Sequence, residues 1–363
     1  MNFKIVDKYL VRQFVQSIFF GIMTFTLIFI VIDMMENLDD FIDQNVAKDI
    51  IFQYYVYFVP EIIRLITPIA ILLACLFTVG KLNNYNELTA LKSSGMSLFR
   101  FMTSFLLVGF VLSLITIYFT AYVVPYSNKQ KVYIEQFYMK KNLVYAGTNL
   151  FFQDSQDKII NISYFDEYSK SASRTGILFL DKSDINHVSK KIDCEQLKWD
   201  TLKNEWIAVK VIERKFISDS KDEVTGYDTL RINYLNFKPE DVLLKQKRVE
   251  ELNIAELMQV INDQKRSGND VTRLLIDLHS IFSFSFANFI VVLFGVPLSV
   301  DRRKGGMAFQ FGANLFFTFI YLGFMKISQS FGKNGLLDPI LTAWFANFVF
   351  IVLAVINILR VRK

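Results

Sequence analysis

The sequence predicts an α-helical membrane protein with six transmembrane helices, arranged three plus three around an inserted all-β, jellyroll-like domain. Hydrophobic residues make up 52% of the 363-residue chain, and 37 residues are Phe. Six long segments are almost free of charge, and crossing a bilayer takes about 20 apolar residues. The stretch between the third and fourth segments is polar and alternates with the two-residue period of β-strands. These observations exclude a disordered or fibrous protein.

The first segment lies near the N-terminus but lacks a small-residue cleavage site, so we expect a retained membrane helix rather than a removed signal peptide. The six candidate spans are 14–32, 54–80, 101–125, 278–300, 306–325 and 339–359. We therefore divide the chain into a first transmembrane half, an inserted β-domain, a connecting helix and a second transmembrane half, at 1–125, 126–252, 253–272 and 273–363.

The charges between the segments predict the orientation. Basic residues gather at the N-terminus, between the second and third segments, between the fourth and fifth, and at the C-terminus. The positive-inside rule makes these regions cytoplasmic. The loop after the first segment is acidic instead, with Asp33, Glu36, Asp39, Asp40, Asp43 and Asp49 against Lys48. We thus expect cytoplasmic termini and an extracytoplasmic β-domain.

The inserted domain contains six alternating stretches, each bounded by Gly, Asn, Asp or Ser. They are LVYAGTNLFFQ, DKIINISYFDE, TGILFLDKS, KKIDCEQLKWD, EWIAVKVIERKFI and TLRINYLNF. Such strands fit a sandwich, a barrel or an open jelly roll, and the pattern does not separate these. After them, Ile254, Leu257, Val260 and Ile261 share one face of a predicted helix that Gly268 ends. That helix is either a passive connector or a relay of motion.

The sequence lacks the motifs of several functional classes. The pairs Gly80-Lys81 and Gly332-Lys333 do not continue as a phosphate-binding loop, so this chain is not expected to hydrolyse ATP by that route. No HExxH, nucleophile elbow or kinase motif occurs, and the two cysteines do not form a metal or disulfide pattern. No basic run alternates with aromatics as nucleic-acid binding requires. We predict a non-catalytic chain that binds no cofactor, metal or nucleic acid.

A few charges lie within apolar surroundings and are candidate ligand contacts. Glu61 and Arg64 are three residues apart in the second segment, so they can pair on a helix. Lys326 ends the fifth segment at the same outer level. Such residues are either interfacial anchors or, as we predict for Arg64 and Lys326, cations at the mouth of a cavity for an acidic amphiphile.

The polar stretch 83–97 between the second and third segments is predicted to be a short amphipathic helix. Glu87, Leu88, Leu91 and Lys92 lie on neighbouring turns, Ala90 is small, and Gly95 before Met96 is a helix stop signal. A helix across the cytoplasmic ends of two spans suits docking into a groove of a soluble partner, as in the coupling helix of an ATP-binding cassette (ABC) permease. It also fits a connector that lies on the membrane surface.

The run PIAILLACLFTVGKLNNYNELTALKSSGMS, from Pro68 to Ser97, resembles the signature of the LptF/LptG permease family. LHSIFSFSFANFIVVLFGVPLSV, the following RRKGGMAFQFG, Tyr321 and LLDPILTAWFANFVF resemble the family's second half, so the likeness covers nearly the whole chain. The opening VDKYLVRQF and the connector ELMQVINDQKRSGNDVTRLLIDLH are closer to LptG than to LptF. The chain departs from the family at Ile281 and at Ala346-Asn347.

The resemblance implies a permease of the bacterial inner membrane that extracts lipopolysaccharide and passes it to a periplasmic bridge. It implies four kinds of partner: an LptB-like ATPase dimer that uses ATP and Mg, a paired LptF/LptG-like permease, LptC/LptA-like periplasmic β-jellyroll proteins, and lipopolysaccharide. Glu87 and its neighbours to Met96 would contact the ATPase. The first and fifth spans would form a lateral gate for lipid, for which Gly21, Gly312 and Ala313 permit close packing.

Two other classes remain open at this point. Permeases for lipoprotein release or efflux are also coupled to an ATPase, but they place their large outer domain after the first of four spans, whereas three spans precede it here. A non-transporting scaffold or sensor would need no ATPase contact around Glu87.

Overall fold

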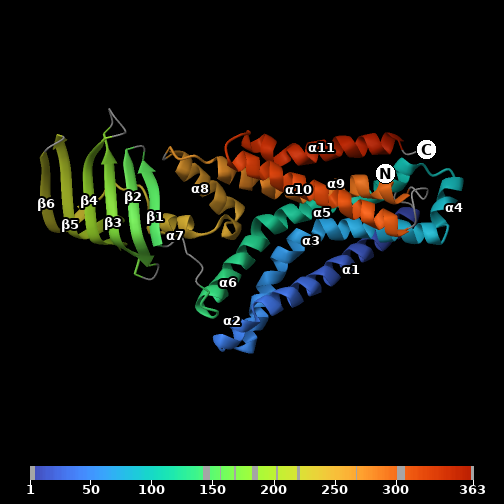
Figure 1. The fold of residues 1–363 in the computed structure, drawn as a ribbon, viewed down its shortest axis with the longest axis horizontal. Helices are drawn as coiled ribbons and strands as arrows, with labels where there is room; N and C mark the ends of the chain where they lie inside the picture. Colours follow the sequence, from blue (N-terminus) through green and yellow to red (C-terminus); the bar gives the residue numbers. More distant parts are fainter. Residues whose placement is uncertain are drawn as a thin grey trace. The chain divides into compact units, whose positions relative to one another are not determined.

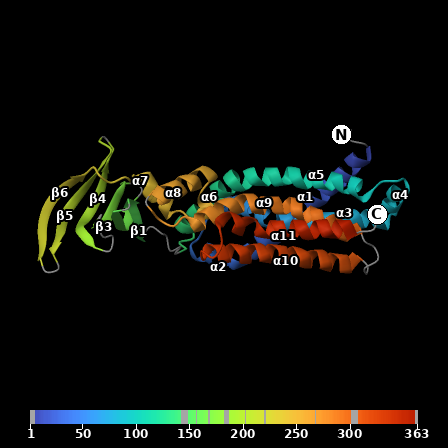
Figure 2. The ribbon, with the colours of Figure 1, turned by 90° about the horizontal axis from the view of Figure 1, so that it is seen from above.

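We describe a computed structural model of the chain that covers residues 5–141, 148–155, 157–166, 169–181, 187–201, 203–218, 221–266, 268–300 and 307–360. The chain forms two compact units, shown as ribbons in Figures 1 and 2. The first unit combines residues 1–141 with 272–363 and is helical, and the second comprises residues 142–271.

Long apolar helices make up the first unit. They are α1 (Ile5–Glu36), α3 (Lys48–Asn84), α5 (Leu98–Tyr118), α6 (Val124–Phe137), α9 (Thr272–Val300), α10 (Met307–Lys333) and α11 (Pro339–Arg360), with short α2 (Leu38–Asp43) and α4 (Glu87–Ser93). Among the described residues, five helical stretches have the length and apolar composition of membrane spans, namely Ile5–Glu36, Lys48–Asn84, Leu98–Phe137, Thr272–Val300 and Pro339–Leu359. These confirm five of the six predicted spans. The segment 306–325 falls largely in α10, which is not among the five.

The core of this unit lies between α3, α5 and α9. Most of the apolar stretch of α3 is buried, whereas only 11% of that of α1 is. The crossing of α5 and α9 depends on Gly109, since a Cβ there would lie 2.9 Å from the Val292 Cγ2 atom. Because α1 is so exposed, it offers a long apolar surface to lipid or to another membrane protein.

The helix after the third span extends beyond the predicted domain boundary. α5 continues without a break through a π-helical turn, η1 (Phe119–Val123), into α6, which ends at Phe137. The boundary that we predict at 125 therefore falls inside a continuous helical stretch, and the first unit runs to Lys141. Sequence patterns did not show this because α6 is polar on average and looks like the start of a soluble domain.

The second unit is built on one antiparallel sheet of six strands in sequential order. The strands are β1 (Thr148–Ser155), β2 (Lys158–Asp166), β3 (Ser171–Leu180), β4 (Val188–Asp200), β5 (Glu205–Ser218) and β6 (Lys221–Ile232). The prediction of an insert with six strands is thus confirmed, although the range predicted as all-β, 126–252, also contains most of α6 and two short helices after the sheet. Its order among the described residues is that of a meander, which differs from the Greek-key order of a jelly roll.

One face of the sheet carries the apolar core of this unit. Trp206 is buried and donates its Nε1–H to the Phe237 carbonyl oxygen at 2.9 Å. The buried Asp154 carboxylate accepts from the backbone N–H groups of Asn236 and Phe237. These bonds hold the chain after β6 against the sheet, where we had predicted further strand. A short helix, α7 (Pro239–Gln246), and a 3₁₀ turn, η2 (Val249–Glu251), follow.

The predicted connecting helix is present as α8 (Ile254–Arg266). Asn253 caps its start, since its Oδ1 accepts from the Glu256 N–H at 2.9 Å and the Glu256 carboxylate accepts from the Asn253 N–H at 3.0 Å. Leu257, Val260 and Ile261 are buried as predicted. Gly268 has a positive φ of 80°, which fits its predicted role as a helix stop.

Candidate functional site

The predicted coupling segment forms a separate helix of seven residues, α4, between the ends of α3 and α5. Asn86 precedes it in the left-handed conformation. At its end, the Gly95 N–H donates to the Lys92 carbonyl and the Met96 N–H to the Leu91 carbonyl, at 3.0 and 3.1 Å. With Gly95 at φ 83°, this is a Schellman motif. The helix is thus shorter than the predicted 83–97, because residues 83–84 belong to α3.

One side of α4 faces the core of its own chain. Leu88 is 4% exposed and belongs to the same apolar cluster as Leu82 and Phe101. Leu91 and Met96 are partly buried against that cluster. Leu88 therefore anchors the helix and is not available to a partner.

Polar contacts tie the same helix to the start of α1. The Tyr9 hydroxyl donates to Glu87 Oε2 at 2.8 Å and accepts from Gln13 Nε2 at 2.7 Å. Nearby, the buried Asp7 carboxylate pairs with Arg100 at the start of α5 and accepts from the Ser104 hydroxyl at 3.0 Å. Charge-assisted bonds of this kind are stronger than neutral ones, so α1, α4 and α5 are joined at one end of the unit.

The other side of α4 is exposed. Thr89, Ala90 and Lys92 point away from the core. Two aromatic residues flank them, Tyr85 before the helix at 69% exposed and Phe99 after it at 53%. Small and aromatic groups next to one cation form a compact surface that a soluble protein can cover.

The two predicted outer cations differ in their surroundings. Arg64 pairs with Glu61 as predicted, with its Nε 3.1 Å from Glu61 Oε2 and its Nη2 on Oε1. Asn128 Nδ2 donates to the same carboxylate at 3.4 Å, and the guanidinium lies 5.8 Å from the centre of the Phe284 ring. Arg64 is thus largely neutralised by its own chain.

Lys326 on α10 is exposed. Among the described residues, no carboxylate pairs with its ammonium group. Of the two predicted cations, Lys326 is consequently the more available to an external anion.

The small residues predicted for a lateral gate are not equivalent either. Gly21 faces α3, where an added Cβ would lie 3.5 Å from the Ala70 Cβ, so its size serves packing within this chain. Gly312 is exposed, and a Cβ there would meet nothing within 4 Å. The side chain of Ala313 is not among those that the structure describes.

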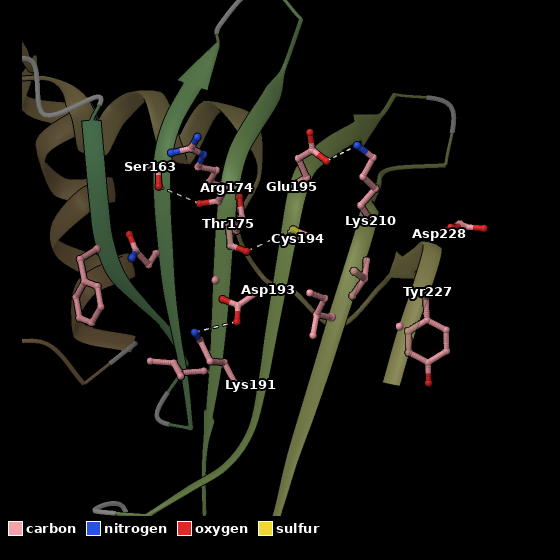
Figure 3. A pocket seen from close by; sticks show the side chains of 17 residues that line it. Ser163, Arg174, Thr175, Lys191, Asp193, Cys194, Glu195, Lys210, Tyr227 and Asp228 are labelled. Atoms are coloured by element: carbon pink, nitrogen blue, oxygen red, sulfur yellow. Dashed lines mark hydrogen bonds and ion pairs between the residues drawn. The ribbon is translucent and has the colours of Figure 1, made fainter. Parts of the chain in front are cut away.

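The sheet carries a groove that the sequence patterns did not predict (Figure 3). It has a volume of about 970 Å³ and extends from β1 to β6 on the face opposite the apolar core. Arg174 and Lys210 line it, both in the left-handed conformation with φ of 49° and 51°. Lys210 Nζ lies 2.6 Å from Glu195 Oε2, and this pairing raises the pKa of Lys210.

Both cysteines are free and buried, and burial raises the pKa of the Cys194 thiol to about 11. Within the part of the chain that the structure describes, no three His, Cys, Asp or Glu side chains come together as a metal site.

Comparison with known proteins decides the family. The profile described as "Lipopolysaccharide export system permease LptF/LptG" matches residues 8–360. The chain belongs to the LptF/LptG family. It is therefore a multi-pass membrane permease of the lipopolysaccharide export system, and the family supplies non-catalytic subunits of that ABC transporter.

Curated relatives of this LptF/LptG family member carry the LptF name. The chain is 21% identical to the lipopolysaccharide export system permease protein LptF of Escherichia coli strain K12, over 97% of this chain and 94% of the relative. LptF of Shigella flexneri matches to the same extent. These comparisons give no specific support to LptG.

Proposed function

We propose that this chain is one of two paired permease subunits that move lipopolysaccharide from the inner membrane toward a periplasmic bridge, driven by a separate ATPase. The observation that carries the proposal is the division of α4 into a buried side and an exposed side. Leu88 and the bond between Tyr9 and Glu87 fix the helix to the chain, while Ala90 and Lys92 face outward. A surface fixed in this way transmits movement of a bound protein directly to α1, α3 and α5.

The proposal includes an orientation and a sixth span. The charge pattern places α4 and both termini in the cytoplasm and the sheet in the periplasm. α10 supplies the sixth span, since it is 27 residues long and carries the predicted segment. Its length of about 40 Å exceeds the roughly 30 Å of a hydrocarbon core.

The sheet offers two ends to LptC/LptA-like partners. Within the part of the sheet that the structure describes, β1 and β6 are the edge strands, and an edge strand is a place where a further strand can pair. An added strand on either edge would continue the sheet into a neighbouring domain. β6 is the longer edge, with 12 residues against 8 in β1.

Lipid contact is proposed for the exposed surface of α1 and for Lys326. Lipopolysaccharide has phosphates at its head and acyl chains below, so an apolar helix surface with a cation at the outer level matches it. Arg64 contributes less in this proposal, because Glu61 already pairs with it. ATP and Mg are expected in the ATPase alone.

The proposal does not depend on whether this chain is the LptF or the LptG subunit. The opening and connector sequences favour LptG, whereas the curated relatives are LptF. The proposal requires only that the partner permease be a second member of the family.

The test is co-purification of tagged protein from native membranes, comparing wild type with Ala90→Arg. A large charged side chain on the exposed side of α4 should remove the ATPase while the second permease still co-purifies. Lys129→Gln is the control, since Lys129 is an exposed residue of α6 at the other end of the bundle. If the wild type brings down no ATPase, the scaffold alternative replaces the transporter proposal.

A further inference from the structure

A second groove lies in the helical unit, between α1 and α3. Its volume is about 420 Å³. The residues that line it are Gln13, Gln16, Ser17, Phe20, Phe77, Thr78 and Lys81. Thr78 donates to Ser17 across it at 3.2 Å, so the two helices are in contact at its floor.

The polarity along this groove changes in the same direction on both helices. On α1, Arg12, Gln16 and Phe20 follow one another at four-residue spacing and are all exposed. α3 runs antiparallel to α1. Along the direction from Arg12 to Phe20 on α1, Lys81 therefore comes before Phe77 on α3. Phe20 and Phe77 are 70% and 55% exposed. Cations therefore stand at one end and aromatic rings about 6 to 12 Å further along, given the 1.5 Å rise per residue.

Among the described residues, no carboxylate pairs with Arg12 or Lys81, in contrast to Arg64 and Arg100. Lys81 lines the groove, whereas Arg12 lies outside its lining, one helical turn before Gln16. A groove with a polar floor, aromatic walls and these two cations at one end is complementary to an anion that is attached to a hydrocarbon chain.

The depth of the groove in the membrane indicates which lipid can supply that anion. With the orientation proposed above, Arg12 and Lys81 lie at the cytoplasmic surface, and Phe20 and Phe77 lie within the inner leaflet. Lipopolysaccharide taken from the outer leaflet has its phosphates on the opposite side. We propose that this groove binds an anionic glycerophospholipid of the inner leaflet, with its phosphate between Arg12 and Lys81 and an acyl chain along Phe20 and Phe77.

The groove is also connected to α4. Gln13 lines it and donates to Tyr9, which donates to Glu87. A lipid in the groove thus lies two hydrogen bonds away from the helix that we propose meets the ATPase.

The test uses the purified permease complex in nanodiscs that contain equal amounts of phosphatidylglycerol and phosphatidylcholine, with native mass spectrometry of retained lipid. Wild type should retain phosphatidylglycerol preferentially. Replacing a basic residue at an anionic surface removes roughly 1 kcal/mol, so Arg12→Gln and Lys81→Gln should each lower that preference about fivefold. Lys129→Gln is the control, since Lys129 is exposed on α6, away from the groove and from α4. Equal retention of both lipids by wild type, or equal effects of all three variants, would overturn the proposal.

A photo-crosslinking side chain at Gln16 distinguishes the occupants. In membranes, we expect a mass increase of one phospholipid. A protein-sized adduct instead would show that a neighbouring transmembrane helix fills the groove, and the lipid proposal would then fail. Free inorganic phosphate should not displace the lipid, because it lacks the acyl chain that the two Phe rings contact. ATPase co-purification is read in parallel, so a wild-type complex that keeps the ATPase but shows no lipid preference rejects only this inference and leaves the proposed function standing.

Discussion

Leu88→Ala should release α4 while leaving the membrane-spanning helices in place. A Leu to Ala change at a fully buried position typically costs about 2 to 5 kcal/mol. Leu88 is 4% exposed. Isolated helices shorter than about 12 residues are marginal in water, so a seven-residue helix depends on this anchor. At 1.4 kcal/mol per factor of ten, the local opening equilibrium of α4 should rise at least about 25-fold.

The assay is amide hydrogen exchange of the purified permease, followed on peptides that cover residues 87–96 and on peptides from α9. Exchange should accelerate in the first set only, and the ATPase should be lost on purification. Thr89→Ala is the matched control, because Thr89 is exposed on the same helix. If exchange in 87–96 stays at the wild-type rate, the reasoning that Leu88 holds α4 is refuted.

Four further predictions follow from single contacts. Tyr9→Phe removes the solvent-exposed bond to Glu87, worth about 0.5 to 1.5 kcal/mol, and should accelerate exchange in α4 to a smaller extent than Leu88→Ala; an unchanged rate would contradict the contact. Cys194 should resist iodoacetamide at pH 8 until the protein is denatured, since burial raises its pKa to about 11; rapid labelling of the native protein would show that it is accessible. Arg174→Gly should stabilise the sheet by about 1 kcal/mol in limited proteolysis, because only Gly adopts φ 49° without strain; faster cleavage would show that the arginine side chain matters more. Burial raises the pKa of Glu251, so the folded unit holds that proton more tightly than the unfolded chain and its stability falls as the pH rises through this pKa; Glu251→Gln should flatten that fall, and an unaltered pH profile would exclude the residue as its source.

Patterns that span many residues were predictable from the sequence. Five membrane spans and six strands follow from charge-free runs and from alternation, because each is a repeated signal in which one residue hardly matters. The first part of β6 was missed, however, since KDEVTGYD is polar on both faces. β6 is an edge strand with most of its side chains in water, so no apolar alternation marks it.

The candidate site was only partly predictable, because which side of a short helix faces inward depends on contacts made by distant residues. From the sequence alone, Glu87, Leu88 and Ala90 are equally good candidates for contact with the ATPase. In three dimensions Tyr9, 78 positions earlier in the chain, donates a hydrogen bond to Glu87, and Leu88 belongs to the same buried cluster as Phe101. The left-handed conformation of Arg174 and Lys210 was likewise invisible, since neither is a residue type that favours it.

The buried bond between Tyr321 and Asn347 bears on how the protein is assembled during synthesis. The Tyr321 hydroxyl on α10 donates to Asn347 Oδ1 on α11 at 2.6 Å, and Asn347 Nδ2 donates to the Ser283 carbonyl on α9 at 2.9 Å. The Tyr321 hydroxyl and the Asn347 side-chain amide would lack these partners in lipid if their helices entered the bilayer alone. With α10 as the sixth span that we propose, α10 and α11 therefore gain from entering as a hairpin and docking on α9 soon afterwards, which makes the last three helices a single unit of insertion.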